Sequence, residues 1–345
     1  MIDFNKDILK FITDYPSRSS KEIHDGLNAA IGYATVKRIL TKLTSDGLIA
    51  PEGKGKGTKY LISPSYELLS PIDIDEYFKK EQDEREIKDG FNLLLITNVL
   101  SKAKLFTKEE EKKLETLHEK FKNNISGMST AEYDKELERL AIDLSWKSSQ
   151  IEGNTYSLLE TERLLLEKET AAGKPKDDAI MLLNHKDAIN FIVAHPDYVV
   201  PLTIRGIEDI HSILIKELGV NRNIRQRRVG ISGTNYKPLD NEHQIRDALI
   251  DMCNLINNKE NVFEKSLLTL VLLSYIQAFA DGNKRTARIV SNAILIAYKY
   301  CPISFRTVDS IEYKKAMLIF YEQNNISAIK EIFKSQFEFA VNTYF

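Results

Sequence analysis

The chain has 345 residues, of which 43% are hydrophobic, so it is long enough for more than one folded unit and a sizeable core. The formal net charge of -2 gives no whole-molecule signal for nucleic acid or a membrane surface. We find no 18-residue apolar run and no basic region followed by an apolar one near the first residue, and therefore expect no membrane span, no signal peptide and a cytoplasmic location. The two cysteines, Cys253 and Cys301, lie among apolar residues and are predicted to be buried and reduced.

Residues 1–64 are predicted to form a small domain of their own. Apolar residues recur at helical spacing in three segments, and two short strand-like runs follow, separated by a basic, glycine-rich turn at 52–59. The helical segments are 7–15, 20–27 and 34–44, and the strand-like runs are 48–50 and 60–62. Three helices followed by a two-stranded ribbon resemble a winged helix-turn-helix, an α+β domain in which residues 35–45 would be the recognition helix.

This first domain has a modest basic excess. Ten basic and seven acidic residues leave a balance of +3. The candidate DNA contacts, in the predicted recognition helix and the basic turn, are Lys37, Arg38, Lys42, Lys54 and Lys56. The alternative is a winged helix that serves protein interaction or dimerisation.

The chain changes character twice after residue 64. Residues 65–90 carry nine acidic and four basic side chains, and we expect a linker that passes into a solvated helix. From residue 91 onward the pattern is almost entirely helical, except for a segment at 227–238 that is rich in β-formers and glycine and predicts a hairpin or flap. The helical segments are 91–103, 107–124, 130–150, 156–170, 176–194, 203–218, 242–257, 264–279, 283–299, 309–322 and 326–343.

The stretch 277–288 carries the strongest chemical signal. Asp281, Gly282 and Asn283 form a turn between two apolar helices, and backbone N–H groups at a helix start favour anions. Arg285 and Arg288 are three residues apart and share a helix face near that end. Two guanidinium groups beside such a turn suit a polyphosphate, and Asp281 can supply oxygen to Mg²⁺ bridging the phosphates.

This stretch resembles the signature of the Fic/Doc (Fido) family, His-x-Phe-x-(Asp/Glu)-Gly-Asn-(Gly/Lys)-Arg-x-x-Arg. The matching residues are Phe279, Asp281, Gly282, Asn283, Lys284, Arg285 and Arg288. The resemblance implies AMP transfer from ATP to a protein hydroxyl, with Asp281 binding Mg²⁺, Arg288 reaching the γ-phosphate and Phe279 in the core. Gly282, Asn283 and Arg285 would cradle the phosphates, with Lys284 beside them. The expected fold class is mainly α, with an all-helical Fic domain over 91–345 and a small β-hairpin flap, preceded by the winged helix.

The sequence departs from the family where the catalytic histidine is expected, because Gln277 stands there. A glutamine amide does not take up a proton near neutral pH, and loss of a positioned base costs about 100- to 10,000-fold in rate. Three readings follow. The domain binds nucleotide but transfers poorly, another group serves as the base, or the residue is an engineered change. Lys284 resembles the Doc branch, whose members transfer phosphate.

A second motif lies at 145–154. Ser148, Glu152 and Gly153 match the family's inhibitory helix, (Ser/Thr)-x-x-x-Glu-(Gly/Asn), and the i, i+4 spacing puts Ser148 and Glu152 on one helix face. The resemblance implies that Glu152 pairs with Arg288 and occupies the place of the γ-phosphate. The plain alternative is a helix that ends at a glycine.

Tyr236 and His211 each have a functional and a structural interpretation. The flap at 229–238 resembles the family's target-docking hairpin, in which Tyr236 would pack near the adenine; a plain surface hairpin is the alternative. His211 lies on an apolar helix face and is predicted to be a packed structural residue rather than a replacement base.

The sequence therefore predicts a Fic-type protein adenylyltransferase that uses ATP and Mg²⁺ and is autoinhibited by Glu152. The rivals are a non-catalytic, nucleotide-sensing regulator that binds DNA through residues 1–64 and a Doc-like phosphotransferase. The expected partners are a target protein of unknown identity, or the chain itself, and DNA, but no membrane. A homo-oligomer is compatible with the sequence.

Overall fold

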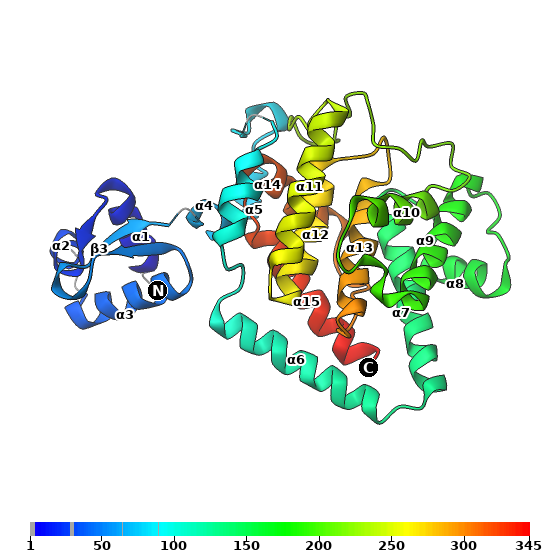
Figure 1. The fold of residues 1–345 in the computed structure, drawn as a ribbon, viewed down its shortest axis with the longest axis horizontal. Helices are drawn as coiled ribbons and strands as arrows, with labels where there is room; N and C mark the ends of the chain where they lie inside the picture. Colours follow the sequence, from blue (N-terminus) through cyan, green and yellow to red (C-terminus); the bar gives the residue numbers. More distant parts are fainter. Residues whose placement is uncertain (1–3, 28–30, 64, 89) are drawn as a thin grey trace.

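The computed structural model describes residues 4–27, 31–63, 65–88 and 90–345. The described chain is mainly helical, with a single small sheet near the N-terminus. Figure 1 shows this N-terminal part, in blue, beside a larger helical part that gathers around α12 (Val262–Ile276) and α13 (Asn283–Ala297).

The N-terminal part builds its own core. It consists of α1 (Phe4–Asp14), β1 (Arg18–Ser19), α2 (Ser20–Gly26), α3 (Tyr33–Ser45), β2 (Ile49–Glu52) and β3 (Lys59–Ile62). The strand order is β1-β3-β2 with antiparallel pairing, and Ile49 lies opposite Ile62. Buried aliphatic residues from all three helices meet on one face of the sheet, among them Ile8, Ile23 and Val36.

The three helices and two later strands predicted for this part are present. The short β1 was not predicted, because two residues are too few for an alternating pattern. Ser19 ends this strand and also caps α2, where its hydroxyl accepts from Glu22 N and its own N–H donates to the Glu22 carboxylate. The winged-helix assignment stays a prediction.

The predicted solvated helix within 65–90 is wrong. The segment forms two single helical turns, α4 (Tyr66–Leu69) and α5 (Ile74–Tyr77), and a 3₁₀ turn at Gln82–Glu84. Its acidic composition suggested full exposure, but Arg85 is buried against Glu322, more than 200 residues further along the chain. A charge balance counted within one segment cannot reveal so distant a partner.

The eleven helices predicted after residue 91 all coincide with observed ones, although the first is π-helical. They are Leu95–Leu100, α6 (Lys108–Ser126), α7 (Thr130–Ile151), α8 (Leu158–Glu167), α9 (Lys176–Ala194), α10 (Ile204–Leu214), α11 (Glu242–Asn258), α12, α13, α14 (Ser310–Gln323) and α15 (Ser327–Thr343), with a 3₁₀ turn at Pro196–Val199. Every residue of α12 is buried, so this helix is the centre of the core. The helices α11, α13 and α14 pack directly against it.

The predicted hairpin at 227–238 is also wrong, since none of these residues, all of which the structure describes, lies in a strand. Ile231 and Tyr236 turn into the core, and Gly233 has a positive φ of 86°. The β-forming residues therefore mark buried anchors of an irregular loop. We keep the name flap for residues 229–238.

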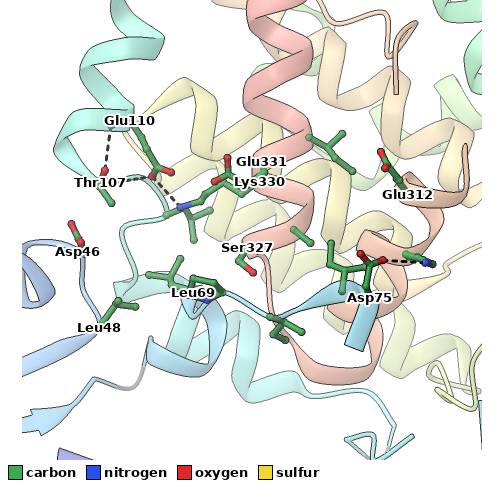
Figure 2. A pocket seen from close by; sticks show the side chains of 17 residues that line it. Asp46, Leu48, Leu69, Asp75, Thr107, Glu110, Glu312, Ser327, Lys330 and Glu331 are labelled. Carbon is green, nitrogen blue, oxygen red and sulfur yellow. Dashed lines mark hydrogen bonds and ion pairs between the residues drawn. The ribbon is translucent and has the colours of Figure 1, made fainter. Parts of the chain in front are cut away.

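A cavity of about 630 Å³ lies where the two parts meet (Figure 2). Asp46 and Leu48 of the N-terminal part face Thr107 and Glu110 at the start of α6. Burial raises the pKa of the Asp46 carboxyl. The two parts thus touch through mixed apolar and charged side chains.

Cys253 and Cys301 are free and buried, as predicted. Burial raises the pKa of the Cys253 thiol to about 12, so it stays protonated at neutral pH. Among the described residues, no helix has the length and apolar character needed to cross a membrane.

Candidate active site

A six-residue loop, 277–282, joins α12 to α13 and forms the floor of the site. Gln277 ends α12 in the left-handed conformation, with φ of 52°. Gly282 caps α13 with φ of 82°, and a Cβ there would come within 3.2 Å of Ile215 Cγ2 and 3.4 Å of His211. The turn therefore requires glycine both for its backbone conformation and for the close packing of α10.

Asn283 holds this loop together. Its Nδ2 donates to Phe279 O at 2.8 Å and its Oδ1 accepts from Phe279 N at 2.8 Å. The same Nδ2 lies 3.2 Å from Gln277 Oε1. The family resemblance assigned Asn283 to the phosphates, whereas here its side chain shapes the loop that would receive them.

Phe279 and His211 pack beneath the loop. Phe279 is buried, and its ring stacks on His211 with ring centres 3.7 Å apart. The ring nitrogen Nε2 of His211 lies 2.9 Å from Asp281 O. Burial lowers the pKa of His211, so its ring stays neutral and serves packing, as predicted.

Gln277 is buried and fully engaged. Its side-chain Nε2 donates to Ser274 O at 2.7 Å, and its backbone carbonyl oxygen accepts from Arg225 Nε at 2.6 Å. Arg225 also donates to Arg227 O and Leu239 O, so one guanidinium ties both ends of the flap to the loop. The amide thus occupies the position of the family histidine without offering a base.

Two buried arginines follow at the start of α13. Arg285 donates through Nη2 to Asp281 Oδ2 at 3.0 Å. Arg288 has no exposed surface. The Cζ of its guanidinium lies 5.5 Å from the centre of the Tyr313 ring. In the described part of the chain, Nη1 of each arginine is buried and has no hydrogen-bond acceptor. Such unsatisfied donors suit the oxygens of a bound phosphate.

Glu152 at the end of α7 is the other partner of Arg288. Arg288 Nη2 donates to Glu152 Oε1 at 2.7 Å, while its Nε and Nη2 donate to Ser148 Oγ and Ser148 O at 2.7 and 3.0 Å. Lys284 Nζ lies 3.9 Å from Glu152 Oε2. Gly153 follows with φ of 100° and turns the chain away. Ser148, Glu152 and Arg288 therefore meet as the sequence motif implied.

The charge of Glu152 is held by this contact. Burial would raise the pKa of its carboxyl, but the positive charges of Arg288 and Lys284 outweigh burial and lower that pKa below its usual value. Burial would likewise lower the pKa of Arg288, and Glu152 reverses the effect. The pair is charged on both sides at neutral pH.

Two cavities meet at Glu152. The smaller, about 160 Å³, is bounded by the loop 277–282, the start of α13 and the flap residues 229–232. The larger, about 380 Å³, lies between Ser232, Gly233 and one side of α14, including Met317 and Tyr321. Because Glu152, Lys284 and Ser232 line both, the two cavities adjoin at the Glu152 side chain.

Asp281 is the carboxylate that a metal ion could use here, because Glu152, which lines the same cavity, is bonded to Arg288. Asp281 is exposed at the mouth of the smaller cavity, and the described residues contain no group of three or more acidic, histidine or cysteine side chains that could hold a metal alone. Mg²⁺ commonly binds through one or two carboxylates together with substrate phosphates and waters. The donor set therefore fits Mg²⁺ only in company with a nucleotide.

Tyr236, which was predicted to pack near an adenine, lines neither of the two cavities. Its side chain is buried, donates to Tyr275 O at 2.9 Å and stacks on Tyr275 with ring centres 4.8 Å apart. The sequence reasoning instead missed Tyr313 and Tyr321, which line the larger cavity from α14. Their helix reads as ordinary core, and no local signal distinguished them.

The DNA-contact candidates lie on the N-terminal part. Lys37, Arg38 and Lys42 are exposed on α3, and Lys54 is exposed in the turn after β2. The side chain of Lys56 lies outside the described residues. The exposed cations thus occupy one helix and the adjoining turn, far along the chain from the loop at 277–282.

Residues 201–295 match the sequence model of the Fic/DOC family. The chain is 27% identical over 175 residues to a protein adenylyltransferase Fic of Nematostella vectensis. The matched region covers 49% of this chain and 40% of that relative. The chain therefore spans less than half the length of this curated relative.

Solved structures show the same fold. A Fic domain-containing signalling protein from Bacteroides thetaiotaomicron superimposes with a TM-score of 0.58 at 19% identity, over 66% of this chain and 94% of that one. Fic-1 (residues 134–508) from C. elegans gives 0.59 at 18% identity, over 68% of this chain and 71% of that one.

The Glu152–Arg288 pair predicts a pH-dependent stability. Because the folded-state pKa of Glu152 lies below its usual 4.5, the carboxylate stabilises the folded protein above that pH, and the contribution is lost as the pH falls through the folded value. Glu152→Gln should therefore cost about 2 kcal/mol near neutral pH, from loss of a charged hydrogen bond, and progressively less in acid. Urea unfolding at a series of pH values measures this.

The control is Glu162→Gln, which removes the same charge from an exposed position of α8. Its stability relative to wild type should vary little with pH. A constant difference between Glu152→Gln and wild type across the acid range would contradict the charged pair.

Proposed function

We propose, from the premise that the chain carries a Fic/Doc family domain, that it is a protein adenylyltransferase which moves AMP from ATP to a Ser, Thr or Tyr hydroxyl of a protein. The observation that carries this proposal is a pair of buried arginines at the start of α13, each with an Nη1 that has no hydrogen-bond partner: Arg285 lines the smaller cavity, and Arg288 lies behind Glu152. A curated relative bears the name protein adenylyltransferase.

The two cavities suit the two halves of ATP. The smaller has polar walls with Lys284 and Arg285, which match the charge of a triphosphate. The larger has Tyr313, Met317 and Tyr321 on α14, which suit a nucleoside. Asp281 at the mouth would hold Mg²⁺, which neutralises charge on the phosphates. The target hydroxyl would approach past the flap.

Glu152 would act as the inhibitor of this site. It lies where the two cavities join and takes the Arg288 donor that a phosphate oxygen would otherwise use. Its carboxylate also repels the phosphates directly, since both are negative. Nucleotide binding therefore requires Glu152 to move or to be displaced.

Gln277 sets the rate that this site can reach. With the side chain bonded to Ser274 O and Asn283, no group at this position accepts the target's proton. The titratable groups that line the smaller cavity are Glu152, Asp281, Lys284 and Arg285, and the carboxylates are engaged with cations. We therefore propose slow transfer, with nucleotide binding better preserved than catalysis.

Two other functions remain as candidates. The element order of the N-terminal part and its exposed cations on α3 favour a winged helix-turn-helix that binds DNA, which would make the chain a nucleotide-sensing regulator. Lys284, the residue by which the signature resembles the Doc branch, favours a Doc-like phosphotransferase; it lies beside Glu152. The target could be the chain itself, and a homo-oligomer would bring two copies together.

Glu152→Gly is expected to tighten ATP binding. The change frees Arg288 and removes a negative charge from the junction of the cavities, and a charged hydrogen bond of about 1.5–3 kcal/mol corresponds to about tenfold or more in affinity. Titration calorimetry with ATP and Mg²⁺ measures this. Glu152→Gln, which keeps the volume, should give an intermediate gain; equal affinities for all three proteins would reject Glu152 as an inhibitor.

Gln277→His is expected to raise AMP transfer, most strongly together with Glu152→Gly. A positioned imidazole supplies about 100- to 10,000-fold. Label from α-labelled ATP on protein reports AMP transfer, and label from γ-labelled ATP reports phosphate transfer. Gln277→Asn remains an amide and should stay at the starting rate. If the variant that combines Gln277→His with Glu152→Gly puts no α-label on protein, the adenylyltransferase proposal is rejected. Label from γ-labelled ATP alone would favour the phosphotransferase.

The N-terminal part is expected to bind duplex DNA with a strong salt dependence. Log affinity falls as log salt rises, and each lost phosphate contact reduces the magnitude of this slope by about 1. The double variant Lys37→Gln with Lys42→Gln should therefore reduce it by about 2. Fluorescence anisotropy across salt concentrations measures the slope. Lys112→Gln, at an exposed position of α6, is the matched control. Affinity that is independent of salt would contradict phosphate contacts.

A further inference from the structure

The segment that leads out of the N-terminal part is bonded directly to the flap. Gln82 Nε2 donates to Asn235 Oδ1 at 2.7 Å, and Asn235 Nδ2 donates to Asp83 Oδ1 at 2.8 Å. Arg85 Nη2 donates to Gly233 O at 2.5 Å. Three residues of the chain stretch 77–88, which we call the clamp segment, therefore hold two residues of the flap.

The clamp segment is itself fixed on the end of α14. The same Nη2 of Arg85 lies 3.1 Å from Glu322 Oε1, and both side chains are almost completely buried. Tyr77 donates its hydroxyl to the other oxygen of Glu322 at 2.6 Å, and Lys88 N donates to Glu322 O at 2.8 Å. The guanidinium also lies over the Phe78 ring at 5.0 Å. Arg85 thus bridges Glu322 at the end of α14 and Gly233 in the flap.

The flap has buried side-chain anchors but few hydrogen bonds from its own backbone. In the described part of the chain, residues 229–238 form no backbone-to-backbone hydrogen bond. Gly233 adopts a φ of 86°, and a Cβ there would stand 3.4 Å from Leu318 Cδ1 on α14. The carbonyl of Gly233 therefore takes its orientation from Arg85, and the flap rests closely on α14 at this point.

Gly233 is also a wall of the larger cavity. It faces Met317, Leu318 and Tyr321 of α14 there, whereas the smaller cavity is lined by flap residues up to Ser232. Arg85 lines neither cavity. Any influence it has on a bound molecule passes through Gly233, and it concerns the nucleoside side of the site rather than the phosphate side.

We propose that Arg85 is a positioning residue for nucleotide binding: it holds Gly233 in place and so sets the width of the cavity that receives the nucleoside. The inference rests on the proposed function for the identity of the ligand. It also makes the clamp segment, which connects the N-terminal part to the Fic domain, a determinant of nucleotide affinity.

The test compares Arg85→Gln with Lys80→Gln, a matched loss of one positive charge at an exposed position of the same segment. All binding is measured in the Glu152→Gly background by calorimetry. Arg85→Gln should weaken ATP binding about tenfold, because binding must then order the flap, and leave inorganic tripolyphosphate binding unchanged. Lys80→Gln should change neither, and Arg85→Lys, which keeps one donor, should restore part of the ATP affinity.

Hydrogen exchange without any ligand tests the clamp separately. The amide of Tyr236, whose buried N–H donates to Thr234 Oγ1, should exchange faster in Arg85→Gln than in Lys80→Gln, while the amides of α12 stay unchanged. Equal exchange of the flap in the two variants, or equal losses of ATP and tripolyphosphate affinity, would overturn the proposal. Failure of Glu152→Gly itself to bind ATP would instead overturn the proposed function, with the exchange result still deciding whether Arg85 holds the flap.

Discussion

The buried guanidinium of Arg288 is the constraint around which this site is built. A cation without exposed surface is costly unless charge and hydrogen-bond partners surround it. Those partners come from Ser148 and Glu152 on α7, about 140 positions away in the chain. The need to satisfy Arg288 therefore fixes the end of α7 against α13. The same need brings a carboxylate into the space where a phosphate would bind.

The loop beneath Arg288 keeps its shape by means that do not involve a catalytic base. Asn283 bonds both backbone groups of Phe279, and Arg225 bonds the carbonyl of Gln277. Gln277 fits this network because its amide donates to one neighbour and accepts from another. In the proposed function, the loop that would receive the phosphates is thus separable from the group that would deprotonate a target. A change at the base position leaves the backbone of the cradle supported.

Much of the fold could be predicted from the sequence because its signals are local. Apolar spacing predicts the helices after residue 91, and the i, i+4 spacing of Ser148 and Glu152 predicts that they share one helix face, from which both contact Arg288. The sequence signals did not predict the structure where contacts between distant parts of the chain determine the conformation. Tyr236 and its β-forming neighbours were interpreted as a hairpin, yet the tyrosine is held by Tyr275, and Gly233 by Arg85. Tyr313 carries no local sign that it faces Arg288.

One helix, α14, connects the features that sequence reasoning treated separately. Tyr313 and Tyr321 face the cavities beside Glu152, while Glu322, the next residue, is buried beneath Arg85 and Tyr77. Lys315 of the same helix lines the cavity against the N-terminal part shown in Figure 2. A displacement of α14 by a bound nucleotide would therefore strain the Glu322 contacts and the clamp segment together. The N-terminal part and the proposed nucleotide site therefore both border α14.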